Sequence, residues 1–138
     1  MNVFAHGDSD ELYDMVASVM MTPKDAGENA VWVQYGLDFL KIYAPLLVWK
    51  RDHKGLDLDA ATMRREANFE TIIDAAFSPF TPKDLREALS EYLRGLSGYS
   101  DIKDMNESDE HFLIAKQQHG YRTMMLGKPL DYLGNRDY

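Results

Sequence analysis

Carboxylates at short spacing are the first residues in this chain that could do chemistry, because such spacing is typical of metal-binding loops. Asp57 and Asp59 have the spacing of the first two ligands in a calcium-binding loop. The twelfth position of such a loop requires glutamate, but here it is Asn68. A second run, which begins at Asp104, has Ala115 at the same position. Because each run precedes a predicted helix, we interpret these carboxylates as helix caps and solvated loop residues.

Histidines and glycine-rich segments are the next candidates, for metal binding, nucleophilic catalysis or phosphate binding. His111 and His119 share a face of one predicted helix, but two helical turns separate them by ~12 Å, so they cannot bind one metal. The segment Gly95–Gly98 lacks the pattern of a nucleophile elbow, and Gly127-Lys128 lacks the rest of a phosphate-binding loop. We therefore expect no catalytic residue, no cofactor and no metal, and we interpret each histidine as a surface or partly buried hydrogen-bonding residue.

A basic grouping remains, and it consists of Lys50, Arg51, His53, Lys54, Arg64 and Arg65. Both parts of this grouping could lie at one end of the molecule. One interpretation is a solvated turn whose cations complement the negative carboxyl end of a long helix. The other is a local anion-contact patch, beside which Trp49 is either a core residue or an aromatic ring that stacks on a base.

The composition predicts a single globular domain over residues 1–138. The chain has 15 basic and 23 acidic residues, a net charge of −8, 45% hydrophobic residues and no cysteine. This apolar content is too high for a disordered chain, and the absence of cysteine excludes disulfides and thiolate metal sites. The negative charge argues against general polyanion binding.

The longest apolar stretch, Val31–Trp49, predicts a long central helix. Gln34, Asp38 and Lys41 fall on one helical face, and apolar and aromatic residues, Trp32 and Tyr35 among them, cover the rest. We therefore expect a mostly buried helix with a narrow polar stripe. Two charged residues at mid-span would each cost ~3 kcal/mol in a bilayer, which disfavours a membrane span.

Helical spacing recurs along the chain, so we expect an all-α fold, a compact bundle of about six helices. Pro45 predicts a kink near Ile42 or a break in the central helix. Gly55, in the charged turn at 50–55, can end the helix in the left-handed conformation. Three further helices are predicted from Asp8 or Ser9 to about Met21, from Asp57 or Asp59 to Ala67, and over Phe69–Phe77. A fourth is predicted to begin at the capping hydroxyl of Thr81, with Pro82 in its first turn. A fifth is predicted to begin at Ser108 and to be interrupted at Gly120. Residues 99–107 and 126–138 are predicted as loop, the latter with a frayed end.

Several short segments occur in a recognisable order: Asp8–Leu12, Trp32, Ala44–Asp52, Gly55–Leu56, Leu93–Tyr99 and Gln118–Tyr121. Over roughly residues 5–125, this order resembles the all-α domain of type IV secretion coupling proteins. These are the ATPases of conjugative DNA transfer and of Dot/Icm-type systems.

The resemblance implies an insertion excised from a larger, RecA-like motor ATPase that is anchored at the bacterial inner membrane. Such a domain sits at the cytoplasmic mouth of a hexamer and receives a relaxase with its single-stranded DNA, or another secreted protein. The nucleotide-binding loop belongs to the surrounding motor, so this chain should not hydrolyse ATP. The segment Gly127–Gly134 departs from the strand-like return to the motor that the resemblance implies.

Three hypotheses follow for function. The first is a docking module whose acidic surface recognises a basic relaxase or signal segment. The second is weak, direct contact with single-stranded DNA, in which case Lys50→Glu with Arg51→Glu should weaken DNA retention and leave docking nearly unchanged. The third is a free-standing helical regulator. In each case we expect the isolated chain to be a monomer.

Overall fold

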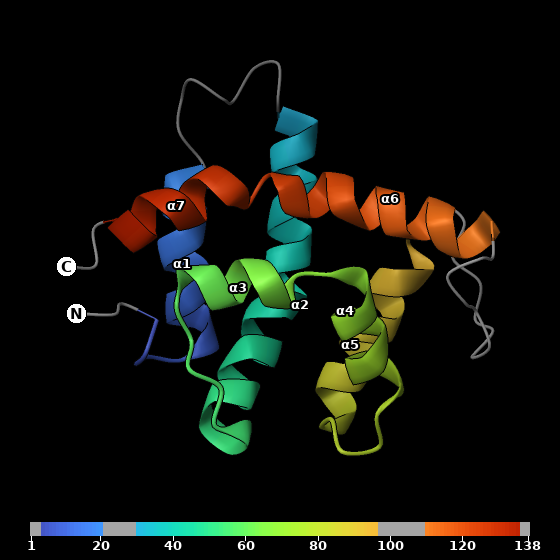
Figure 1. The fold of residues 1–138 in the computed structure, drawn as a ribbon, viewed down its shortest axis with the longest axis horizontal. Coiled ribbons are helices and arrows are strands. Elements are labelled where there is room, and N and C mark those ends of the chain that lie inside the picture. Colours follow the sequence, from blue (N-terminus) through green and yellow to red (C-terminus); the bar gives the residue numbers. More distant parts are fainter. Residues whose placement is uncertain (1–3, 21–29, 97–109, 136–138) are drawn as a thin grey trace.

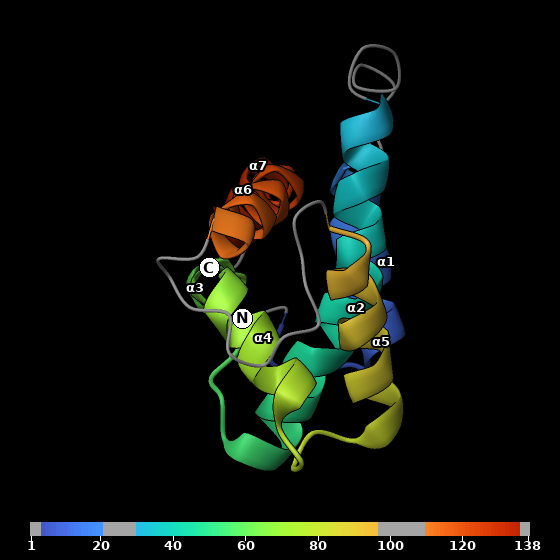
Figure 2. The ribbon, with the colours of Figure 1, turned by 90° about the vertical axis from the view of Figure 1, so that its right-hand side faces the viewer.

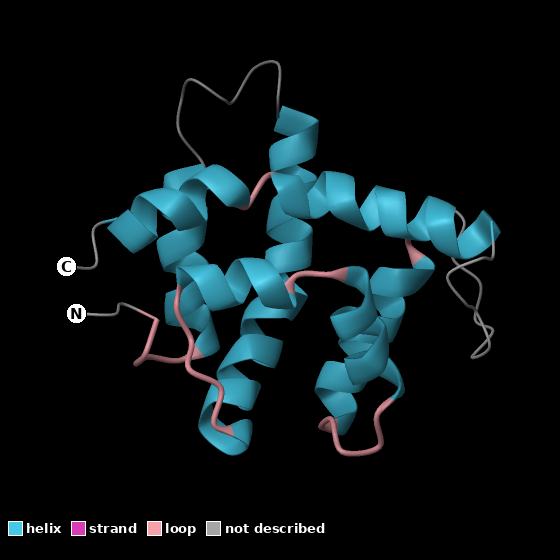
Figure 3. Ribbon diagram, viewed as in Figure 1, coloured by secondary structure: helices cyan, strands magenta, loops and turns pink. Residues whose placement is uncertain are grey.

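The computed structural model describes residues 4–20, 30–96 and 110–135, which form seven α-helices and no strand (Figures 1 and 3). The helices are α1 (Ser9–Met20), α2 (Ala30–Lys54), α3 (Ala60–Glu66), α4 (Phe69–Phe77), α5 (Lys83–Arg94), α6 (Glu110–Met124) and α7 (Gly127–Asn135). The predicted all-α bundle with a long central helix is confirmed. Residues 99–107, predicted as a loop, lie outside the described ranges.

The helices form two layers, which are seen edge-on in Figure 2. One layer contains α1, α2 and α5, and the other contains α3, α4, α6 and α7. The central helix α2 contacts α1, α5 and α6, and its buried residues Phe39, Tyr43 and Leu47 are fully shielded from solvent. The core therefore lies between the layers, with α2 as its main contributor.

Local capping accounts for the starts of three helices. The carboxylate of Asp8 accepts the backbone N–H of Glu11 at 2.8 Å, and that of Asp59 accepts the N–H of Thr62 at 2.7 Å. The side chain of Asn68 caps α4 in the same way. These caps satisfy backbone donors that have no partner within the helix. The predicted caps at Asp59 and Asn68 are confirmed, and Asp8 rather than Ser9 caps α1.

The central helix α2 runs through Pro45 without the break that we considered, and the charged residues from Lys50 to Lys54 form its end. Pro45 removes one backbone hydrogen bond, but the flanking Ala44 and Leu46 are completely buried, and their packing offsets that loss. Gly55 follows the helix with φ +70°, which confirms the predicted left-handed stop.

Two predictions about helix boundaries are wrong. Thr81 is buried and does not cap α5; Pro82 is the N-cap residue and makes no side-chain capping bond. Gly120 does not interrupt α6, which continues to Met124. A single glycine costs a helix only about 1 kcal/mol, and the burial of Ala115 and His119 in the same helix outweighs this cost.

The predicted loop at 126–138 is also wrong, because α7 occupies most of it. Leu126, Leu130 and Leu133 are buried on one face, and α7 contacts α1 and α3. Gly127, Pro129 and Gly134 are poor helix formers, so the sequence did not indicate this short apolar stripe. The first and last helices of the described chain are therefore in contact, at the left of Figure 1.

Candidate docking surface

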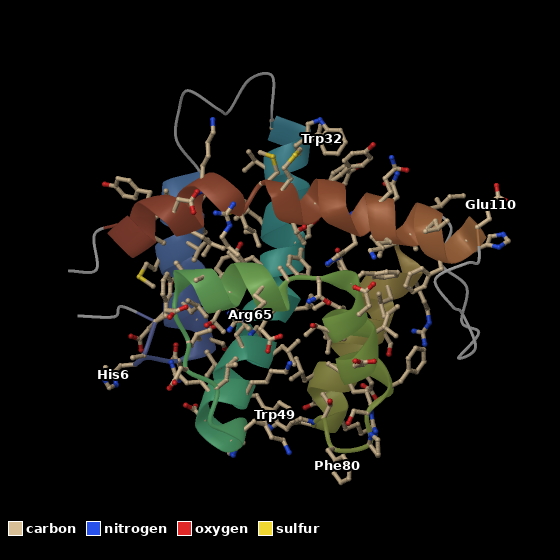
Figure 4. The ribbon with its side chains drawn as sticks, in the orientation of Figure 1. His6, Trp32, Trp49, Arg65, Phe80 and Glu110 are labelled. Atoms are coloured by element: carbon tan, nitrogen blue, oxygen red, sulfur yellow. The ribbon has the colours of Figure 1, made fainter. Side chains whose placement is uncertain are left out.

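The six predicted basic residues lie on two different helices. Lys50, Arg51, His53 and Lys54 occupy the final turns of α2, at the bottom of Figure 1, whereas Arg64 and Arg65 lie on α3. Figure 4 shows Arg65 near the middle of the molecule, away from the end of α2. Most of these cations also have partners within the chain.

Arg51 is a structural residue that ties the N-terminal segment to α2. Its guanidinium donates to the backbone oxygens of Phe4 at 3.1 Å and Gly7 at 2.6 Å, and it pairs with Asp52 at 2.8 Å. The Phe4 side chain is buried in the core. Arg51 therefore holds this segment in place, and its guanidinium is already bonded to groups of the same chain.

Three other basic residues have intramolecular partners. Lys50 pairs with Glu66 at 3.2 Å, and Arg65 donates to the Thr62 hydroxyl. Arg64 pairs with Asp131 at 2.6 Å, which links α3 to α7. These contacts favour a structural role for the cations over the predicted anion patch.

Lys54 lies beside two aromatic rings. Its ammonium is 5.5 Å from the centroid of the Trp49 ring and 5.8 Å from that of Phe80, both within the range of cation–π attraction. Trp49 is partly buried and packs against the core, as expected, and its ring is also near His53. The surrounding residues form an open cleft of about 340 Å³ between the end of α2 and the α4–α5 connection. We call it the Trp49–Phe80 cleft.

A second group of exposed residues lies where α2 and α6 meet, at the top of Figure 4. We call it the aromatic surface, and it consists of Val31, Trp32 and Tyr35 from α2 and Tyr121 and Met124 from α6. The Trp32 ring meets those of Tyr35 and Tyr121 edge-on, at centroid distances of 5.8 and 6.2 Å. We expected Trp32 and Tyr35 to be buried, but they are 42% and 37% exposed.

A close helix approach positions the aromatic surface. A Cβ at Gly36 would lie 2.8 Å from the Met20 methyl group of α1 and 3.0 Å from the Met125 Cβ, so a larger residue would require both neighbours to shift. Arg122 lies 4.9 Å from the centroid of the Tyr35 ring. The aromatic surface is thus built on two rigid helices rather than on a loop.

A buried histidine fixes α6 in position. His119 is 2% exposed; it meets the backbone oxygen of Ala67 through Nε2 and the Tyr92 hydroxyl through Nδ1. A carbonyl oxygen only accepts, so Nε2 carries the proton and Nδ1 accepts from Tyr92. Desolvation lowers the pKa of His119 to about 4, and burial raises the pKa of Tyr92, so both side chains are neutral at physiological pH. His119 is more buried than we expected, whereas His111 is exposed.

Sequence reasoning missed the aromatic surface and the Trp49–Phe80 cleft. Trp32 and Tyr121 each fit the apolar pattern of their own helix, and no local signal indicates that they meet. Phe80 had a detectable signal, because it lies between Pro79 and Pro82 in a short connection that displays it to solvent.

The described residues contain no other arrangement that indicates chemistry. Among them, no cluster of three or more His, Asp or Glu could hold a metal ion. None of the helices in the described ranges has the length and apolar character that crossing a membrane requires.

Comparison with known proteins gives one informative match. No family model matches the sequence, and no solved structure matches the chain. The type 4 coupling protein DotL of Legionella pneumophila is 25% identical over 148 aligned residues, which cover 98% of this chain and 18% of DotL. The chain thus spans less than a fifth of the length of the relative that it matches. The match supports a relationship between this chain and the coupling proteins of type IV secretion systems.

Proposed function

We propose that this chain is the substrate-docking part of a type IV secretion coupling protein. It receives protein cargo, such as a relaxase with its attached single-stranded DNA, and presents it for delivery to the secretion channel. The observation that carries the proposal is the aromatic surface, which is exposed on a chain similar to DotL over almost its whole length. This similarity favours a coupling-protein role over that of a free-standing regulator.

The composition of the aromatic surface supports protein docking. Tryptophan, tyrosine and arginine are the residue types that contribute most binding energy at protein interfaces. Here Trp32, Tyr35 and Tyr121 form edge-on ring contacts, and Arg122 lies over the Tyr35 ring. Because helices hold these side chains, little conformational entropy is lost when a partner binds.

The net charge adds long-range attraction for a basic cargo. The chain carries a net charge of −8, and α1 exposes Asp10, Glu11 and Asp14 without a basic residue of its own. Such a field accelerates encounter with a basic partner more than it strengthens the final complex. In this proposal the acidic surface steers the cargo, and the aromatic surface anchors it.

The contact between α1 and α7 fits a domain that is inserted into a larger protein. An inserted domain must leave its host and return to it at nearby points, and the first and last described helices are neighbours. We propose that the host is the motor ATPase, at the cytoplasmic face of the bacterial inner membrane. ATP hydrolysis then belongs to the motor, and this chain contributes no catalytic residue.

The first test measures secretion by cells that carry the full-length coupling protein. Trp32→Ala with Tyr121→Ala should lower the translocation of a reporter-tagged cargo at least tenfold, because loss of two central aromatics costs about 2 kcal/mol or more. Tyr132→Ala is the matched control, because Tyr132 is also exposed but lies on α7. Normal translocation by the double variant, at normal protein levels, would contradict the proposal.

A second test addresses direct DNA contact. The pair Lys50→Glu with Arg51→Glu is unsuitable, because Arg51 holds the N-terminal segment. Lys54→Glu with Arg65→Glu changes two exposed cations instead. With a labelled thirty-nucleotide oligo-dT, we expect fluorescence anisotropy to give a dissociation constant above about 10 μM at 150 mM salt. Submicromolar binding that the double variant abolishes would instead assign DNA contact to the chain.

A further inference from the structure

The Trp49–Phe80 cleft has walls from two parts of the chain. Trp49 and Lys54 come from the end of α2, and Phe80 comes from the connection between α4 and α5. Asp74 of α4 and the Thr71 side chain also line the cleft. Figure 4 shows Trp49 above Phe80 at the lower edge of the molecule. Lys50 lines the cleft as well, so the cleft combines two aromatic rings with two lysines and one carboxylate.

Hydrogen bonds hold the backbone at Phe80 in place, and the side chain is exposed to solvent. Its side chain is 78% exposed, yet its backbone N–H donates to the Ser78 hydroxyl and the next N–H donates to the Ser78 carbonyl oxygen. Pro79 and Pro82 restrict the backbone on either side. Thr81, beside it, is buried and anchors the connection. The backbone at Phe80 is therefore fixed, so the exposed ring is displayed at a defined position beside Lys54.

Lys54 is the cation of the cleft that is available to a ligand. Among the described residues, Lys50 is paired with Glu66, whereas the Lys54 ammonium lies over two aromatic rings and pairs with no carboxylate. An ammonium next to apolar surface attracts an anionic group, and the resulting charge-assisted hydrogen bond is stronger than a neutral one. The cleft therefore suits a ligand that offers a carboxylate next to an apolar group.

The charge around the cleft favours a peptide over a nucleic acid. A nucleic acid strand brings a phosphate with every nucleotide and needs several cations along its path. Here the carboxylates of Asp74 and Glu66 lie at or beside the cleft, and one lysine is available. A peptide with a single acidic residue matches this balance, and Asp74 can accept one of its backbone N–H groups.

We propose that the Trp49–Phe80 cleft binds a short peptide segment of a partner protein, in which an aromatic residue is directly followed by an aspartate or glutamate. The aromatic side chain packs against Trp49 and Phe80, and the carboxylate meets the Lys54 ammonium that lies over both rings. This cleft is separate from the aromatic surface, so the proposal for the cleft does not depend on the proposed function.

The two tryptophans of the chain allow a sharp test, because one lies in each surface. The probe is the capped peptide Gly-Ser-Phe-Glu-Ser-Gly, titrated into the labelled 138-residue chain while NMR follows both indole N–H signals. We expect the Trp49 signal to shift with a dissociation constant of about 0.1–1 mM, while the Trp32 signal stays in place. Replacing either Phe or Glu of the peptide by Ala should weaken binding about tenfold.

Variants of the chain complete the test. Phe80→Ala and Lys54→Ala should each raise the dissociation constant about tenfold, and Lys54→Met separates loss of charge from loss of the aliphatic stem. Lys41→Ala, exposed elsewhere on α2, is the matched control and should bind normally. The proposal is overturned if the Trp49 signal does not move below about 5 mM peptide. Unchanged binding by the Lys54 variants, or tighter binding of a six-nucleotide oligo-dT than of the peptide, would overturn it too.

Discussion

Individual residues in this protein have roles that their types alone do not reveal. Arg51 is a surface cation by sequence, but in the structure it binds two backbone oxygens and the neighbouring Asp52. Tyr43 is similar, because its hydroxyl donates to the backbone oxygen of Met63 from a completely buried position. Such bonds matter because an unpaired polar group in the core costs about 1–3 kcal/mol.

The buried His119 predicts a specific pH dependence of stability. The unfolded chain binds a proton at this side chain near pH 6.5, whereas the folded chain binds it only near pH 4. The contribution of His119 to the free energy of unfolding is therefore complete above pH 6.5. It falls by about 3 kcal/mol as the pH drops toward 4. Desolvation is the main cause; Arg122 opposes protonation as well, whereas Glu70 and the Ala67 carbonyl favour it.

Urea denaturation at a series of pH values measures this effect. His119→Gln is the matched variant, because glutamine can hydrogen-bond but does not titrate. It should be less stable at pH 7.5, and its stability should change much less between pH 6.5 and 4.5. A wild-type slope that survives in this variant would assign the pH dependence to other groups, such as Glu70 and Asp59, whose pKa values hydrogen bonds lower.

At the scale of elements, α7 is the clearest difference between expectation and structure. It is attached to α3 and α1 by buried leucines and to Arg64 by the exposed ion pair with Asp131. Exposed ion pairs contribute at most about 1 kcal/mol, whereas a fully buried leucine contributes several times more. The leucines therefore hold α7, and the ion pair mainly selects its position.

Two substitutions in α7 separate these contributions. Leu130→Ala should lower the free energy of unfolding by about 2–4 kcal/mol, and Asp131→Ala by less than about 1 kcal/mol. Both values come from urea denaturation followed by circular dichroism. A frayed tail, as the sequence suggests, would give a Leu130→Ala effect close to zero, and that result would contradict the helix packing described above.

The whole molecule combines a strong negative charge with two exposed apolar sites. The aromatic surface and the Trp49–Phe80 cleft lie at opposite ends of α2 in Figure 4. A partner that occupies one site does not obstruct the other. The two sites could therefore be occupied at the same time, if both bind partners as proposed.

The charge also predicts the state of the isolated chain in solution. Each copy carries a net charge of −8, so two copies repel each other at separations up to the Debye length, about 8 Å at physiological salt. We expect a monomer of 15.8 kDa by sedimentation velocity at micromolar concentration. A stable dimer under these conditions would contradict the prediction, and its loss on Trp32→Ala would identify the aromatic surface as the contact between copies.

The sequence alone was sufficient for features that depend on neighbouring residues. The all-α class, the caps at Asp59 and Asn68, and the helix stop at Gly55 all follow from hydrophobic spacing and from bonds that span a few residues. These interactions form within one turn of the chain. Their outcome therefore does not depend on how the helices are arranged.

Only the tertiary structure decided which polar and aromatic groups are available to a partner. Arg51 reaches Phe4 across 47 residues, and Arg64 reaches Asp131 across 67 residues. Trp32 of α2 meets Tyr121 of α6, although 89 residues separate them in the sequence. Such contacts depend on which helices become neighbours, and that choice is made by burial of apolar surface over the whole chain. The spacing of residues along the sequence therefore does not indicate which helices become neighbours.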